Sequence, residues 1–202
     1  VICMDEAHRY YAPASMKAIN FLKPVLGLEF TATPKSTNNV IYAYDLARGA
    51  VEGYLKTPVV MGRSNMAGYS SEDIEEMKIR DGLTLHEHRK GVIRQFCGDN
   101  ELPYVKPIVL IACRDTNHAK EVRALIDSDS FLGGKYKGKV IEIHSNMKGD
   151  ESEENIRLLL SIENAQNPVE IVLHVYKLKE GWDVNNLFTI IPLNAAKSDI
   201  LA

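Results

Sequence analysis

The chain has 202 residues, of which 45% are hydrophobic and 25% are charged, and its formal net charge is −3. This length gives room for one or two domains with a proper core, and the composition is that of an ordinary globular protein. The slightly acidic balance argues against a dedicated, strongly basic DNA-binding domain, but it is compatible with a protein that grips phosphates through backbone amides and a few side chains.

The start of the chain predicts a strand, a helix and a second strand, at residues 1–4, 14–23 and 25–31. The first strand is an unbroken apolar run, the helix is ended by Pro24, and the second strand is stopped by Pro34. This order is typical of the tail of a doubly wound α/β domain, with its first half absent. We expect the domain junction in the polar, turn-prone residues 36–40.

The middle of the chain is less regular. A helix is predicted over residues 44–54 and a strand over Thr57–Met61, followed by a charged helical stretch at residues 70–97. Ser70 or Ser71 can cap this stretch, which begins acidic and ends basic. The glycines inside it, Gly82 and Gly91, leave open one long helix or two shorter ones. We interpret the stretch as a solvated charged helix, with a surface for DNA or a partner domain as the alternative.

The last hundred residues alternate between strands and helices. Strands are predicted at residues 107–113, 139–143, 169–175 and 187–193, and helices at 117–126 and from Asp150 or Ser152 to about 163. Because the loops between them are short, this order predicts the α/β class, with a parallel sheet and helices on both of its faces.

Two strand ends carry the groups that indicate chemistry. The first strand runs into Asp-Glu-Ala-His, and the second runs into Thr-Ala-Thr-Pro. In a parallel sheet such groups gather at the carboxyl ends of the strands. Asp5 can hold magnesium through water, and Glu6 can orient and deprotonate an attacking water. His8 lies just beyond, where it can reach Thr31 and Thr33 at the neighbouring strand end.

With these two phrases the chain resembles the core of a superfamily 2 helicase of the DEAH type, which is built on two RecA-like domains. Three later phrases extend the resemblance from motif II to motif V: Ile-Val-Leu-Ile-Ala-Cys-Arg-Asp-Thr-Asn-His at 108–118, Val-Ile-Glu-Ile-His-Ser-Asn-Met at 140–147, and Ile-Val-Leu-His-Val-Tyr-Lys-Leu-Lys-Glu-Gly-Trp-Asp-Val at 171–184. Lys-Glu-Gly-Trp-Asp-Val, followed by an Ile-Ile-Pro-Leu strand, is similar to the restriction subunit of type III restriction-modification enzymes. Tyr44-Asp45-Leu46, leading into Gly53-Tyr54-Leu55-Lys56-Thr57-Pro58, points the same way.

The resemblance implies a division into residues 1–38, the C-terminal fragment of the first RecA-like domain, and residues 39–202, the second domain with a variable helical segment at about 62–104. It implies ATP and Mg²⁺ as cofactors. The catalytic set is Asp5, which ligates Mg²⁺ through water, Glu6 and His8, with Thr31 and Thr33 coupling hydrolysis to movement. The implied nucleotide-binding residues are Gly181 and Asp183. The implied nucleic-acid contacts are Arg114, Thr116, Asn117, His144, Ser145 and Lys177; helix capping or a solvated loop is the alternative for each.

The sequence has no Gly-x-x-x-x-Gly-Lys-Ser/Thr loop, and motif VI and the nuclease domain of the family are also absent. We therefore expect a piece of a larger motor that hydrolyses essentially no ATP alone. The parent would be an ATP-dependent translocase or helicase that works on duplex DNA for restriction, with a methyltransferase subunit that recognises the site. Another superfamily 2 motor (type I restriction, repair or RNA helicase) and a non-catalytic nucleic-acid-binding scaffold are the alternatives.

The remaining features favour a protein of a reducing cytoplasm. Cys3, Cys97 and Cys113 are far apart without a Cys-x-x-Cys pair, so we expect free thiols and no zinc cluster, with Cys3 and Cys113 buried. His86-Glu87-His88 is not predicted to bind metal, because helix neighbours one and two apart point in different directions. No apolar run approaches membrane-spanning length.

Overall fold

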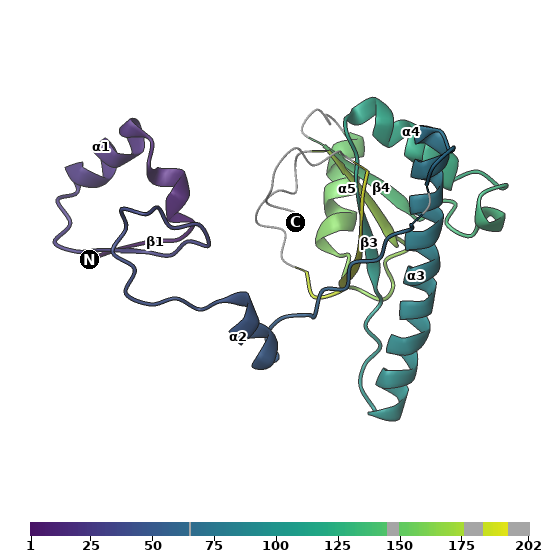
Figure 1. Ribbon diagram of the computed structural model, residues 1–202, viewed down its shortest axis with the longest axis horizontal. Helices are drawn as coiled ribbons and strands as arrows, with labels where there is room; N and C mark the ends of the chain where they lie inside the picture. Colours follow the sequence, from purple (N-terminus) through teal and green to yellow (C-terminus); the bar gives the residue numbers. More distant parts are fainter. Residues whose placement is uncertain (65, 145–149, 176–183, 194–202) are drawn as a thin grey trace. The chain divides into compact units, whose positions relative to one another are not determined.

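A computed structural model of the protein describes residues 1–64, 66–144, 150–175 and 184–193 (Figure 1). The chain forms two compact units, Val1–Gly62 and Arg63–Ala202. Both contain parallel strands with flanking helices, so the predicted α/β class is confirmed and the arrangement is consistent with RecA-like sheets. The predicted boundary at residue 38 stays a prediction. Among the described helices, none combines the length and the apolar character that a membrane crossing requires.

The first unit contains the predicted strand, helix and strand. Its elements are β1 (Ile2–Met4), the 3₁₀ helix η1 (Ala7–Tyr10), α1 (Pro13–Phe21), β2 (Gly27–Glu29) and α2 (Leu46–Val51). β1 pairs with β2 in parallel, with Cys3 opposite Leu28. Pro13 suits the first position of α1, because the N–H it lacks would have no partner there. Asp45 caps α2 by accepting the N–H of Arg48 at 2.7 Å.

Two predictions for this unit are wrong. Thr57–Met61 is not a strand, and Val60 is 97% exposed. A strand needs a partner for its backbone groups, and no described strand pairs with this segment. Cys3 is exposed rather than buried, because its strand belongs to a sheet of only two described strands, which buries little surface.

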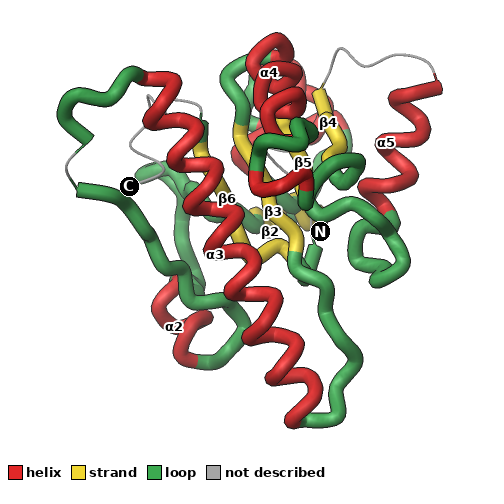
Figure 2. The backbone as a smooth tube through the Cα atoms, turned by 90° about the vertical axis from the view of Figure 1, so that its right-hand side faces the viewer, coloured by secondary structure: helices red, strands yellow, loops and turns green. Residues whose placement is uncertain are grey.

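The second unit is built on a four-stranded parallel sheet with the order β4-β5-β3-β6. Its elements are α3 (Ser71–Asp99), β3 (Ile108–Ala112), α4 (Thr116–Ile126), the 3₁₀ helix η2 (Leu132–Gly134), β4 (Val140–His144), α5 (Asp150–Leu160), β5 (Ile171–Val175) and β6 (Leu187–Pro192). α3 and α4 cover one face of the sheet and α5 covers the other (Figures 1 and 2). The predicted parallel sheet with helices on both faces is therefore confirmed.

The central strand β3 is buried along its whole length. Val109 and Ile111 belong to the core under α3 and α4, whereas Ile108 and Leu110 belong to the core under α5. Successive side chains of a strand point to opposite faces, so a strand between two helical layers must be apolar at every position. This explains why the continuous apolar run predicted β3.

α3 is one helix of 29 residues, which answers the question that Gly82 and Gly91 left open. Ser70 and Asp73 form a capping box at its start. The interpretation of this stretch as a solvated helix is wrong for its first half, because Ile79 and Leu83 are buried against the sheet. A Cβ atom on Gly82 would lie 2.4 Å from Cδ1 of Ile191 in β6, so glycine permits the close approach of helix and strand.

Candidate functional site

The carboxyl ends of β1 and β2 lie side by side in the first unit. The N–H of Phe30 donates to the carbonyl of Met4 at 2.9 Å, and the N–H of Ala7 donates to the carbonyl of Phe30 at 3.0 Å. Asp5 and Glu6 follow β1 directly, and Thr31 follows the end of β2. Parallel pairing thus brings the acidic pair and the threonine loop to the same edge, as the sequence predicts.

Glu6 adopts a left-handed backbone conformation with φ 49° and ψ 47°. This is uncommon for a residue other than glycine, and strain of about 1–3 kcal/mol is typically kept where geometry matters for function. Oδ1 of Asp5 accepts the N–H of Glu6 at 3.0 Å, which supports the turn. The same turn places Oε2 of Glu6 3.3 Å from Nδ1 of His8. Both carboxylates are exposed at the strand end.

His8 links the acidic turn to the loop that follows β2. Its Nδ1 atom lies 3.4 Å from Oγ1 of Thr31, and the same hydroxyl oxygen accepts the N–H of Thr33 at 3.1 Å. The predicted proximity of these residues is therefore confirmed, with Thr33 joining through its backbone. The catalytic and coupling roles of the five residues stay predictions.

Three side chains that the sequence reasoning missed hold this loop in place. The hydroxyl of Tyr11 donates to Oε2 of Glu29 at 2.6 Å, and Nδ2 of Asn38 donates to the same oxygen at 2.7 Å. Hydrogen bonding to the Glu29 carboxylate raises the pKa of Tyr11. Nζ of Lys35 lies 3.8 Å from the centroid of the Tyr11 ring. Because 18 residues separate Tyr11 from Glu29, no local sequence signal reveals the cluster.

The donor groups at this edge suit a magnesium nucleotide. Mg²⁺ prefers oxygen ligands, keeps several waters and is bound through one or two carboxylates together with substrate phosphates. Exposed carboxylates on Asp5 and Glu6 can serve a hydrated ion in this way, and a carboxylate that is not bound to the metal can take a proton from water. The residues present therefore fit the cofactors that the resemblance implies.

In the second unit, Arg114, Thr116 and Asn117 lie at the carboxyl end of β3 and the start of α4. The helix start is as predicted, but Oδ1 of Asp115 accepts the N–H groups of Asn117 and His118, each at 2.9 Å. These two hydrogen bonds lower the pKa of Asp115, with that from His118 the stronger cause. A phosphate at these amides would have to displace the Asp115 carboxylate, and the predicted nucleic-acid contacts stay predictions.

Glu75 of α3 binds two groups of the β3–α4 segment, and the sequence reasoning did not single it out. Its Oε2 atom accepts a hydrogen bond from Nη1 of Arg114 at 2.6 Å, and its Oε1 atom lies 2.6 Å from Nε2 of His118. The His118 side chain is 3% exposed, whereas that of Arg114 is 51% exposed. Arg114 is thus held at one end and accessible to solvent.

The other predicted site residues lie at the edge of the described part of the chain or outside it. His144 is the last residue of β4. Ser145, Lys177, Gly181 and Asp183 lie outside the described residues.

A buried polar cluster lies next to the amino end of β5. His86, Glu87 and Glu170 offer ligand atoms within 4.8 Å of one another. Two residues of the His86-Glu87-His88 run therefore lie near a second carboxylate, that of Glu170. Lysines already neutralise this cluster: Nζ of Lys90 lies 2.6 Å and Nζ of Lys139 2.7 Å from oxygens of Glu170. We therefore assign the cluster to stability rather than to a metal.

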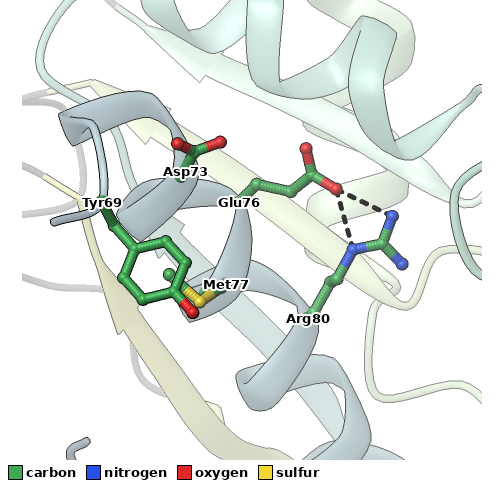
Figure 3. Close-up of a pocket in the computed structure, with 5 residues that line it drawn as sticks. All are labelled: Tyr69, Asp73, Glu76, Met77 and Arg80. Atoms are coloured by element: carbon green, nitrogen blue, oxygen red, sulfur yellow. Dashed lines mark hydrogen bonds and ion pairs between the residues drawn. The ribbon is translucent and has the colours of Figure 1, made fainter. Parts of the chain in front are cut away.

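An open hollow of about 280 Å³ lies beside the first turns of α3 (Figure 3). It is lined by Tyr69, Asp73, Glu76, Met77 and Arg80. Nη2 of Arg80 and Oε1 of Glu76, four residues apart on α3, form an ion pair of 2.8 Å along the helix beside it. Because Arg80 already neutralises Glu76, we assign no chemistry to this hollow.

The described fold is that of a parallel α/β protein, and a match to a family model supports a helicase-like region at its start. Residues 1–36 match the family model described as "Type III restriction enzyme, res subunit". The matched segment contains Asp5, Glu6, His8, Thr31 and Thr33. A search of curated proteins found no match to the chain.

Proposed function

We propose that this chain is part of an ATP-dependent DNA translocase or helicase motor, of the kind that serves type III restriction. The observation that carries the proposal is the joining of the acidic pair to the threonine loop through His8, within the segment that matches the family model. The sequence contains no phosphate-binding Gly-x-x-x-x-Gly-Lys-Ser/Thr loop. The proposal therefore assigns that loop, and the arginine of motif VI, to sequence outside these residues.

In this proposal each of the strand-end residues has its own role in ATP hydrolysis. Bound Mg²⁺ supplies charge neutralisation at the phosphates of ATP. Asp5 holds the hydrated ion through water, and Glu6 orients the attacking water and accepts its proton. His8, which lies between Glu6 and Thr31, passes a displacement of the acidic turn to the loop after β2. Gly181 and Asp183 are proposed to contact the nucleotide.

The proposed partner is duplex DNA, together with a methyltransferase subunit that recognises the site. Arg114, Thr116 and Asn117 are proposed to contact the DNA backbone at the carboxyl end of β3, and the proposed contacts also include His144, Ser145 and Lys177. A half-exposed guanidinium at such an edge suits a phosphate, because its planar N–H groups match phosphate oxygens.

The experiment replaces Glu6 by Gln in the full-length protein that carries this chain. Loss of the general base is expected to lower ATP turnover about a hundredfold or more. The matched control is Glu52→Gln, which removes a carboxylate of the same unit that pairs with Arg48, and turnover should be retained. Equal turnover by the Glu6→Gln variant and the unmodified protein would contradict the assignment.

A further inference from the structure

The carboxylate of Glu75 connects three segments of the second unit. Glu75 lies in the first turns of α3, Arg114 follows β3, and His118 lies in the first turn of α4. Between 39 and 43 residues separate Glu75 from its two partners. Both Glu75 oxygens are used, one for the guanidinium and one for the imidazole. The side chain is therefore held at two points.

A second contact of the His118 ring indicates which of its two nitrogens carries the proton. The backbone N–H of Arg114 donates to Nδ1 of His118 at 3.1 Å, so Nδ1 is the acceptor. A neutral imidazole with an acceptor Nδ1 carries its proton on Nε2. His118 thus donates from Nε2 to Glu75 and receives from the Arg114 backbone. This chain of hydrogen bonds fixes the loop that carries Arg114 as well as its side chain.

We propose that Glu75 is a positioning residue that holds Arg114 ready for a nucleic-acid phosphate. This inference rests on the proposed function and deepens it. A guanidinium has more N–H donors than one carboxylate oxygen uses, so Arg114 can be held by Glu75 through Nη1 while its other donors reach a phosphate. Because a long side chain loses rotamer freedom on binding, a guanidinium that is held beforehand binds at a lower entropic cost.

The proposal predicts a change in DNA affinity opposite in direction to the change that charge repulsion alone predicts. Glu75 carries a negative charge beside a site for a polyanion, so charge repulsion alone predicts that its removal strengthens DNA binding. Positioning predicts that its removal weakens DNA binding. A role in packing alone predicts no effect beyond that of other α3 substitutions.

The experiment measures the Kd of the full-length protein for a fluorescein-labelled DNA duplex. Glu75→Gln keeps an oxygen that can accept from His118 but loses the ion pair with Arg114. We expect Kd to rise roughly two- to tenfold, the factor that corresponds to ordering one long side chain. The matched control is the adjacent Glu76→Gln, which breaks the ion pair with Arg80 on the same helix, and its Kd should stay unchanged.

Two further variants separate positioning from folding. Arg114→Ala should weaken binding and reduce the slope of log K against log salt by about 0.9, and Glu75→Gln should add nothing in that background. Arg114→Lys keeps the charge and leaves Glu75 and His118 in place but loses the planar fork. It should weaken binding even if Glu75→Gln proves too unstable to measure.

Three results would each overturn the inference. The first is DNA binding by Glu75→Gln that is tighter than, or equal to, that of the unmodified protein. The second is an effect of Glu75→Gln on Kd that is as large in the Arg114→Ala background as in the unmodified protein, and the third is full DNA affinity of Arg114→Lys. If such a result accompanies DNA-stimulated ATP turnover by the unmodified protein, the proposed function stands and only the role of Glu75 is wrong. An unmodified protein with neither DNA affinity nor DNA-stimulated turnover would overturn both.

Discussion

Nδ1 of His8 lies 3.4 Å from Oγ1 of Thr31, although 23 residues separate the two along the chain. Each residue follows a different strand of the parallel pair, so the contact joins the turn after β1 to the loop after β2. Glu6 contacts the same imidazole nitrogen at 3.3 Å. A movement of the carboxylate during hydrolysis would therefore reach the threonine loop through one side chain.

Thr31→Val tests this connection, because it removes the hydroxyl and nearly keeps the shape of the side chain. Loss of the acceptor for Thr33 and of the contact with His8 should uncouple hydrolysis from movement. We expect the movement of DNA per ATP hydrolysed to fall roughly fivefold, about the effect of one hydrogen bond. Triplex displacement and ATP turnover, measured together on the full-length protein, give this ratio.

Thr31→Ser is the matched variant, because it keeps the hydroxyl, and its ratio should stay close to that of the unmodified protein. Equal losses of turnover and movement in Thr31→Val would mean that Thr31 supports the site without coupling.

The second prediction concerns the packing of α3 against β6. Gly82→Ala would place a Cβ atom 2.4 Å from Cδ1 of Ile191, a side chain that is 4% exposed and has little room to move. Overpacking of this kind should lower the free energy of unfolding by about 1–3 kcal/mol. Urea unfolding of the 202-residue chain, followed by circular dichroism, measures the change.

The control lies nine residues further along the same helix. A Cβ atom on Gly91 meets nothing within 4 Å, so Gly91→Ala should raise the free energy of unfolding by about 0.5–1 kcal/mol through backbone entropy alone. Stabilisation by both substitutions would show that α3 does not pack closely on β6.

The third prediction concerns stability in acid. Burial raises the pKa of Glu87, but hydrogen bonds from Lys135, Tyr136 and Lys90 outweigh it and lower the pKa to about 2, from an ordinary value of 4.5. At Glu170 burial is opposed in the same way by the nearby His86 ring and by hydrogen bonds from Lys139 and Lys90, so the pKa of Glu170 lies well below its usual range.

A group whose pKa is lower in the folded state than in the unfolded state stabilises the fold above its unfolded pKa. The contribution of Glu87 should thus be complete above about pH 4.5 and disappear as the pH falls toward about 2. Urea unfolding at several pH values should show that Glu87→Gln is less stable than the unmodified chain at neutral pH, and that the difference narrows across this window. A difference that stays constant with pH would contradict the pKa assignment.

The central strand β3 was predictable because it is a continuous apolar run, as expected of a parallel strand that is buried on both faces. The packing of α3 on the sheet could not be predicted from the sequence, because Ile79, Leu83 and His86 form a narrow buried face in an otherwise charged helix. The strand predicted at Thr57–Met61 failed for the opposite reason, since β-branched residues favour a strand only where another strand pairs with them.

The candidate site residues also include some that the sequence predicts and some that it does not. The cluster of Asp5, Glu6 and Thr31 follows from the rule that reactive groups gather at the carboxyl ends of parallel strands. The contacts of Glu75 with Arg114 and His118 depend on how a helix packs beside a strand end about 40 residues away. Spacing within the sequence carries no record of such a contact, so only the packed structure reveals it.

The most direct test of the proposed motor is ATP turnover by the full-length protein that carries this chain, measured with Mg²⁺ in the presence and absence of duplex DNA. We predict turnover that depends on Mg²⁺ and rises when duplex DNA is added. Absence of turnover with every nucleic acid tested would contradict the motor and favour a scaffold that binds without hydrolysis.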